Sequence, residues 1–179
     1  MDSVVLQQGR VFLRFDVLGY QFPEIGDQEW DSDWLNVRLH LQCGERTWER
    51  VDPALTSFEI QWLADWLDEV AQHAATFGSW RHNRLTTRIF FTEPCLGFEV
   101  LNGHPTGAAM TFRCFLAAEF LPPFKDLYPH ADLGEGTGEV WLDFSMDEAR
   151  LRAIAARWRE ALGRFPVRLG VRSIPPPLG

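Results

Sequence analysis

A regular alternation of apolar and polar residues from position 35 to position 43 limits the possible folds of this chain more than any other feature. The apolar members are Leu35, Val37, Leu39, Leu41 and Cys43, and the polar members are Asn36, Arg38, His40 and Gln42. Successive side chains of a strand point to opposite faces, so the pattern predicts a strand with one buried face. Gly44 and Glu45 can then turn the chain into a second strand at 46–51, which gives a hairpin.

The same period of two recurs along most of the chain. It predicts further strands at 11–17, 85–92, 97–101, 108–120, 139–144 and 165–172. Two segments instead repeat their apolar residues at three and four positions, as amphipathic helices do. The first begins with the capping-box pattern Thr56-Ser57-Phe58-Glu59 and ends near Ala75, and the second begins at Ser145-Met146-Asp147-Glu148 and ends at Gly163.

The order of these elements indicates the fold class. Strands follow one another as hairpins, and strict alternation of strands with helices is missing, which argues against a parallel doubly wound sheet. We therefore predict an α+β fold with a mostly antiparallel sheet of about six to eight strands and two amphipathic helices packed on one face. The length fits one domain, which we place at 1–174, and we expect the Pro-rich tail at 175–179 to be frayed.

Composition excludes several classes of protein. No segment reaches 18 consecutive apolar residues, and positions 1–10 lack the pattern of a signal peptide, so we expect no membrane association and a cytoplasmic location. Three cysteines far apart, Cys43, Cys95 and Cys114, fit reduced thiols. Residues 1–80 carry 14 acids against 5 arginines within a net charge of -8, and such an excess repels phosphate. Direct binding of nucleic acid is therefore disfavoured.

Signals of catalysis are absent from the sequence. It contains no Gly-rich phosphate loop, H-E-x-x-H, G-x-S-x-G or C-x-x-C motif, and its five histidines are scattered singly. The cysteines lack the short ligand pairs of a zinc site. We therefore predict no catalytic residue, no metal and no cofactor. An enzyme would have to rely on isolated groups such as Glu93, Glu99 and His104.

The segment from Glu24 to Trp34 is the most unusual stretch, because acids alternate with tryptophans. It is a poor calcium loop, since counting from Asp27 places Ser32 where glycine is needed and Arg38 where a bidentate Glu is needed. It is either a solvated loop anchored by its tryptophans or a surface that attracts a basic partner. For the second interpretation the candidate partner-binding residues are Glu24, Asp27, Glu29, Trp30, Asp31 and Asp33.

Several short segments in a fixed order resemble a known family. They are Tyr20-Gln21-Phe22-Pro23, Asp31-Ser32-Asp33-Trp34-Leu35-Asn36-Val37, Asp52-Pro53, Leu55-Thr56, Glu59, Ala64-Asp65-Trp66-Leu67, Glu93-Pro94, Phe98-Glu99 and Phe165-Pro166-Val167-Arg168. Through them the chain resembles the WapI family of bacterial immunity proteins, which are cytosolic partners of contact-dependent polymorphic toxins. The likeness extends from position 20 to position 168, and the sequence departs from the family pattern at Cys95-Leu96-Gly97.

The resemblance implies a non-enzymatic inhibitor that binds a toxin domain, often an RNA-cleaving one, in the producing cell. A nuclease must be basic to hold phosphate, and an acidic protein can occupy that surface. Our first hypothesis is therefore an immunity protein for a basic toxin. The alternative is a bacterial domain that binds a small ligand, or a second copy of itself, in a groove between helix and sheet. The oligomeric state and the identity of the toxin stay open.

Overall fold

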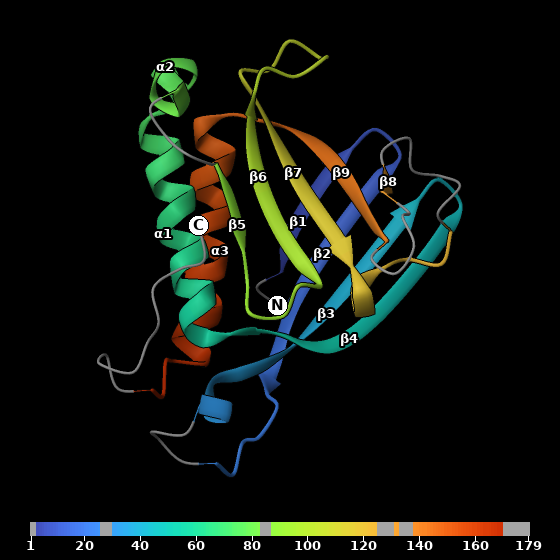
Figure 1. Cartoon of the computed structure of the whole chain (residues 1–179), viewed down its shortest axis with the longest axis vertical. Helices are drawn as coiled ribbons and strands as arrows, with labels where there is room; N and C mark the ends of the chain where they lie inside the picture. Colours follow the sequence, from blue (N-terminus) through green and yellow to red (C-terminus); the bar gives the residue numbers. More distant parts are fainter. Residues whose placement is uncertain (1–2, 26–29, 83–86, 125–130, 133–137, 170–179) are drawn as a thin grey trace.

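The computed structural model describes residues 3–25, 30–82, 87–124, 131–132 and 138–169. Within these residues the chain forms two antiparallel sheets, three α-helices and three short 3-10 helices (Figure 1). The first sheet has the order β1 (Val4–Gln8), β2 (Val11–Tyr20), β3 (Trp34–Cys43), β4 (Arg46–Thr56). The second has the order β5 (Arg88–Phe90), β6 (Leu96–Asn102), β7 (Met110–Ala117), β9 (Glu139–Met146), β8 (Ala131–Asp132). The helices are η1 (Trp30–Asp33), α1 (Ser57–Gln72), η2 (Ala74–Thr76), α2 (Phe77–His82), η3 (Ala118–Phe120) and α3 (Glu148–Arg164). The predicted α+β class is confirmed.

The predicted hairpin at 35–43 and 46–51 is the centre of the first sheet. β3 pairs with β4 in antiparallel register, with Cys43 opposite Arg46, and Gly44 makes the turn with a φ of +64°. Every apolar member of the alternating run except Cys43 is fully buried, as the pattern predicts. Register shifts at Val17/Gly19 and Leu35/Asn36 interrupt the pairing of β2, β3 and β4 at the end nearest η1. Irregular pairing of this kind bends a sheet.

One apolar core lies between the two sheets and the long helices. Phe15 of β2 contacts Phe98 of β6, with ring centroids 6.0 Å apart, and Trp158 of α3, with centroids 5.8 Å apart. All three side chains are buried, each with about 1% of its surface exposed. The sheets also meet at their edges, where Gln8 Oε1 of β1 accepts a hydrogen bond from the Ser145 amide of β9 at 3.0 Å. The residues of both sheets and of α1 and α3 therefore form one continuous cluster.

The two predicted amphipathic helices are α1 and α3, which lie side by side (Figure 1). The capping box at Thr56 and Glu59 is present as the sequence predicts. The second helix begins later than predicted. Its N-cap is Asp147, whose carboxylate accepts from the Arg150 amide at 2.8 Å, because β9 continues through Ser145 to Met146.

Some local predictions differ from the structure. β1, α2 and β8 were not anticipated, and the strand predicted at 108–120 ends at Ala117, where η3 follows with Ala118 at a φ of 45°. The strand predicted at 165–172 is absent from its described part, residues 165–169, since two of its amides bond to a carboxylate instead. The tail at 175–179 lies outside the described residues. No helix among the described residues is both long and apolar enough to cross a membrane.

Candidate functional site

An open hollow of about 440 Å³ lies at one end of the first sheet. We call it the acidic groove, and it is lined by Gln21, Phe22, Trp30, Asp31, Trp34, Pro53 and Glu93. These residues come from the segment after β2, from η1, from β3, from β4 and from the connection between β5 and β6. Figure 1 shows η1, the start of α1 and the segment after α3 at the lower end of the molecule. The groove thus combines segments that are distant in the sequence.

The lining of the groove combines carboxylates with aromatic rings. Asp31 and Glu93 supply the negative charges, and the described residues that line the groove include no Lys, Arg or His. Trp30 is 40% exposed, unusually high for so large an apolar side chain, and its ring packs on Phe58 of α1 at a centroid distance of 5.4 Å. Such a surface favours a partner that offers both positive charge and a flat or apolar group.

The wall of the groove that η1 forms is held in place from the interior by Asp33. This residue is 0% exposed, and its carboxylate accepts hydrogen bonds from the Ser57 hydroxyl, the Arg168 amide at 2.9 Å and the Leu169 amide at 2.7 Å. Ser57 is the first residue of α1. A buried carboxylate needs such donors, because an unpaired charge in the interior is strongly unfavourable. Asp33 therefore holds η1 against α1 and the segment after α3.

The guanidinium of Arg168 completes this fastening. Its Nη1 donates to the backbone carbonyls of Phe22 at 3.2 Å, Ile25 at 3.0 Å and Ser32 at 3.3 Å. Its Cζ lies 3.4 Å from the ring centroid of Tyr20. The side chain thus crosses the loop between β2 and β3 and fixes it at several points. These hydrogen bonds direct the guanidinium to backbone oxygens.

The wall of the groove that carries Glu93 is held in place by Glu59, which is 1% exposed. Its Oε2 accepts from the amide and the hydroxyl of Thr56, at 2.9 and 3.0 Å, and so completes the capping box. Its Oε1 accepts from the backbone amide of Thr92 at 2.6 Å. Thr92 immediately precedes Glu93, so the N-terminal turn of α1 also fixes the wall that carries Glu93.

The buried Cys95 thiol lies near Glu93 and two further carboxylates. The pKa of the Cys95 thiol is raised from 9.0 to about 12, mainly by burial and in part by the carboxylates of Glu119, Glu93 and Asp52. Each of these acids must lie near the thiol to act on it. Asp52 is also paired with Arg50 at 3.1 Å. Glu93 of the groove therefore lies in a neighbourhood that also contains Glu119 and Asp52.

The predicted partner-binding residues fall into three groups. Glu24, Trp30 and Asp31 are exposed, and the last two line the acidic groove. Asp33 is buried, so its carboxylate holds the segment and does not face solvent. Asp27 and Glu29 lie outside the described residues.

Sequence reasoning about the acidic segment missed the other lining residues of this site and the arginine that fastens it, which are Gln21, Phe22, Trp34, Pro53, Glu93 and Arg168. A signal for them was nevertheless present. Each of them belongs to one of the short segments through which the chain resembles the WapI family. Their convergence on one site could not be read from those segments separately.

The isolated groups considered for an enzyme do not come together. Glu93 precedes β6 and His104 follows it, so a seven-residue strand of about 20 Å separates them. The His104 ring is hydrogen-bonded to Thr106 at 2.7 Å, and Glu99 pairs with Arg88 at 3.4 Å. In the part of the chain that the structure describes, no three His, Cys, Asp or Glu residues are grouped as metal ligands. The cysteines Cys43, Cys95 and Cys114 are free.

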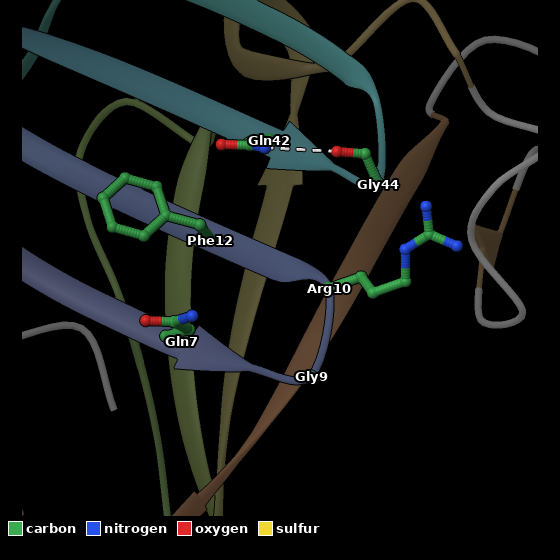
Figure 2. A pocket seen from close by; sticks show the side chains of 6 residues that line it. All are labelled: Gln7, Gly9, Arg10, Phe12, Gln42 and Gly44. Atoms are coloured by element: carbon green, nitrogen blue, oxygen red, sulfur yellow. Dashed lines mark hydrogen bonds between the residues drawn. The ribbon is translucent and has the colours of Figure 1, made fainter.

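A second hollow of about 310 Å³ lies at the opposite end of the first sheet, beside the β1–β2 and β3–β4 turns. Its lining residues are Gln7, Gly9, Arg10, Phe12, Gln42 and Gly44 (Figure 2). Figure 2 shows the side chains of Arg10 and Phe12 pointing in different directions, while Gln42 bonds to the Gly44 carbonyl at 3.2 Å. The polar groups do not converge on a common point, which a ligand site requires.

The family model of the immunity protein WapI-like family matches residues 5–166. The chain belongs to this family. The resemblance drawn from the short segments is therefore confirmed. No curated protein and no solved structure matches the chain. In this WapI-like protein, the residues that line the acidic groove lie within the matched range.

Proposed function

We propose that this chain is an immunity protein that binds and neutralises a basic toxin domain, without catalysis, through the acidic groove. The contact surface comprises Trp30, Asp31 and Glu93 in the groove and the exposed Glu24 beside it. Asp27 and Glu29, in the same acidic segment, extend it on sequence grounds. The observation that carries the proposal is the meeting of the family-like segments around one anionic hollow in a member of an immunity protein family.

The pairing of charges supports this choice of surface. On the second sheet two acids are matched internally, since Arg88 pairs with Glu99 and Arg113 with Asp143. Among the described residues, in contrast, no ion pair joins Glu24, Asp31 or Glu93 to a basic side chain. Their charge is therefore available to attract a positively charged protein and to speed its association.

A nuclease would be a suitable toxin for such a surface. An enzyme that cleaves RNA carries positive charge where it holds phosphate, and an acidic protein seated there excludes the substrate. The proposal places the protein in the cytoplasm of the producing cell, where the RNA of that cell would need protection from the toxin. Neutralisation in this way needs only binding, which agrees with the general absence of enzymes from immunity protein families.

The proposal is tested by measuring the affinity of the chain for the toxin encoded beside its gene, from about 50 to 500 mM salt. We expect the affinity to fall as salt rises, and D31N and E93Q each to weaken binding by about three- to tenfold, mainly through slower association. The matched control is E45Q, which removes an exposed carboxylate at the far end of β3. Affinity that ignores both salt and the groove variants would contradict the proposal.

A further inference from the structure

Two arginines on the second sheet show how this chain holds a guanidinium group. Arg113 makes a two-pronged contact with Asp143, with Nε–Oδ1 and Nη2–Oδ2 distances of 2.8 and 2.9 Å, and its Cζ lies 5.4 Å from the Trp141 ring centroid. Arg88 Nε lies 3.4 Å from Glu99 Oε2, and its Cζ lies 4.2 Å from the Phe115 ring centroid. In both cases a carboxylate forms an ion pair with the guanidinium and an aromatic ring lies against it.

This arrangement follows from the chemistry of arginine. The guanidinium is planar and always charged, it matches a carboxylate with two parallel hydrogen bonds, and it is weakly enough hydrated to stack on a ring. A lysine ammonium is a compact point charge and cannot make the same fork. A carboxylate beside an exposed aromatic ring is therefore more selective for arginine than for positive charge in general.

The acidic groove contains the same two kinds of partner but no guanidinium from this chain among its described lining residues. Asp31 and Glu93 supply carboxylates, and Trp30 and Phe22 supply rings. Arg168 contacts the same loop, but its Nη1 is hydrogen-bonded to three backbone carbonyls and its Cζ lies over Tyr20. The hollow of about 440 Å³ falls within the range of volumes that hold small ligands.

We propose that the acidic groove receives an arginine side chain of the toxin, with Asp31 and Glu93 binding the guanidinium and Trp30 covering its face. This inference rests on the proposed function and deepens it by naming the residue type that anchors the partner. It also explains why Trp30 is exposed beside two carboxylates, because a desolvated ring and a paired charge together make a strong anchor.

A first experiment examines the groove without any toxin. The probe is N-acetyl-arginine amide, titrated into the isotope-labelled chain while the indole N–H signal of Trp30 is followed by NMR. The isosteric but uncharged N-acetyl-citrulline amide and the point-charged N-acetyl-lysine amide serve as comparisons. We expect a saturable shift of Trp30 with the arginine probe, a weaker one with lysine and none with citrulline. The buried Trp158 provides an internal signal that should stay unchanged.

Two variants complete this titration. The double variant D31N/E93Q should abolish the response to the arginine probe, while the control E45Q should respond as the parent chain does, because Glu45 lies at the other end of β3. D31N and E93Q are both isosteric substitutions of side chains that are not fully buried, so the double variant should retain the fold. A citrulline response equal to that of arginine, or a double variant that responds like the parent, would overturn the inference.

A second experiment uses the toxin complex and separates the two proposals. Each exposed arginine of the toxin is changed to lysine and combined with E93Q in a double-mutant cycle. For one toxin arginine, we expect the change to lysine to weaken the affinity of the toxin for the parent chain by at least about fivefold. The same change should have no effect on the affinity for the E93Q variant. If a salt-dependent complex forms but no arginine is coupled to Glu93, the anchor is disproved and the proposed function stands. If no complex forms, the proposed function fails, and the probe titration still decides whether the groove binds arginine.

Discussion

The carboxylate of Glu59, in the first turn of α1, accepts a hydrogen bond from the backbone amide of Thr92 at 2.6 Å. Two residues earlier in the same turn, Ser57 donates to the carboxylate of Asp33. One helix end thus holds the connection that carries Glu93 and the 3-10 helix that carries Asp31. The relative position of the two groove carboxylates is therefore set by hydrogen bonds to two buried carboxylates, those of Glu59 and Asp33.

Replacement of Glu59 by Gln should destabilise the fold and loosen one wall of the groove. Gln has one side-chain oxygen where Glu has two, so it can accept from the Thr56 amide or from the Thr92 amide but not from both, and we expect the free energy of unfolding to fall by about 1–2 kcal/mol. Urea denaturation measures this change, and faster hydrogen exchange at the Thr92 amide should accompany it. The control is E148Q in the first turn of α3, where an exposed pair with Arg152 should contribute less than about 0.5 kcal/mol. Equal losses in the two variants would argue against the buried role of Glu59.

Replacement of Asp33 by Asn should destabilise the chain by about 1–3 kcal/mol, because at least one of its buried donors loses its acceptor. The neighbouring variant D31N is a close control, since the Asp31 side chain is exposed and its change should stay within about 0.5 kcal/mol. Thermal or urea unfolding compares the two. The two variants should rank the other way in affinity for the toxin. At temperatures where both chains are folded, D31N should bind the toxin more weakly than D33N. A D33N chain as stable as the parent would show that the fastening is unimportant.

Replacement of Phe15 by Ala should be severe, because this ring joins both sheets to α3. Removing a buried Phe leaves a cavity, and we expect a loss of about 3–5 kcal/mol in the free energy of unfolding. Phe12, in the same strand and on the opposite face, is only half-buried and contacts the His40 ring at 6.1 Å. F12A should therefore lose no more than about 1.5 kcal/mol. Urea denaturation measures both free energies of unfolding. Similar decreases for F15A and F12A would contradict the assignment of Phe15 to the core.

The thiols should react in an order set by burial. At pH 8 a thiol reagent should modify the half-buried Cys43 before the buried Cys95 and Cys114, as peptide mass spectrometry can show. The pKa of Cys95 is raised from 9.0 to about 12, so the folded chain binds more protons than the unfolded chain between these values. The stabilisation linked to the neutral thiol is complete below pH 9 and is lost as the pH rises toward 12. The parent chain should therefore lose stability across this window more steeply than C95A, and parallel pH profiles would contradict the assignment.

Signals confined to a few neighbouring residues were readable from the sequence. The alternation at 35–43 reports which side chains share a face, and the Thr56-to-Glu59 pattern reports a helix start, because in both cases the partners are a few residues apart. Family membership was also readable, since the resemblance drawn from the short segments agrees with the family match at residues 5–166. The strand predicted at 165–172 illustrates the limit of such signals. Its described part gives its amides to Asp33, a partner that no local pattern names.

By itself, the sequence determined the antiparallel α+β class, the two long helices, the capping box and an acidic segment with Trp30 and Asp31 among its candidate binding residues. Only the tertiary structure decided that Trp30 and Asp31 are exposed, that Asp33 faces inward and that Glu93 lines the same groove as Asp31. The reason is physical. Side-chain periodicity records burial on one face of an element, whereas the donors that satisfy a buried carboxylate, and the strands that bring two acids together, come from residues far away in the chain.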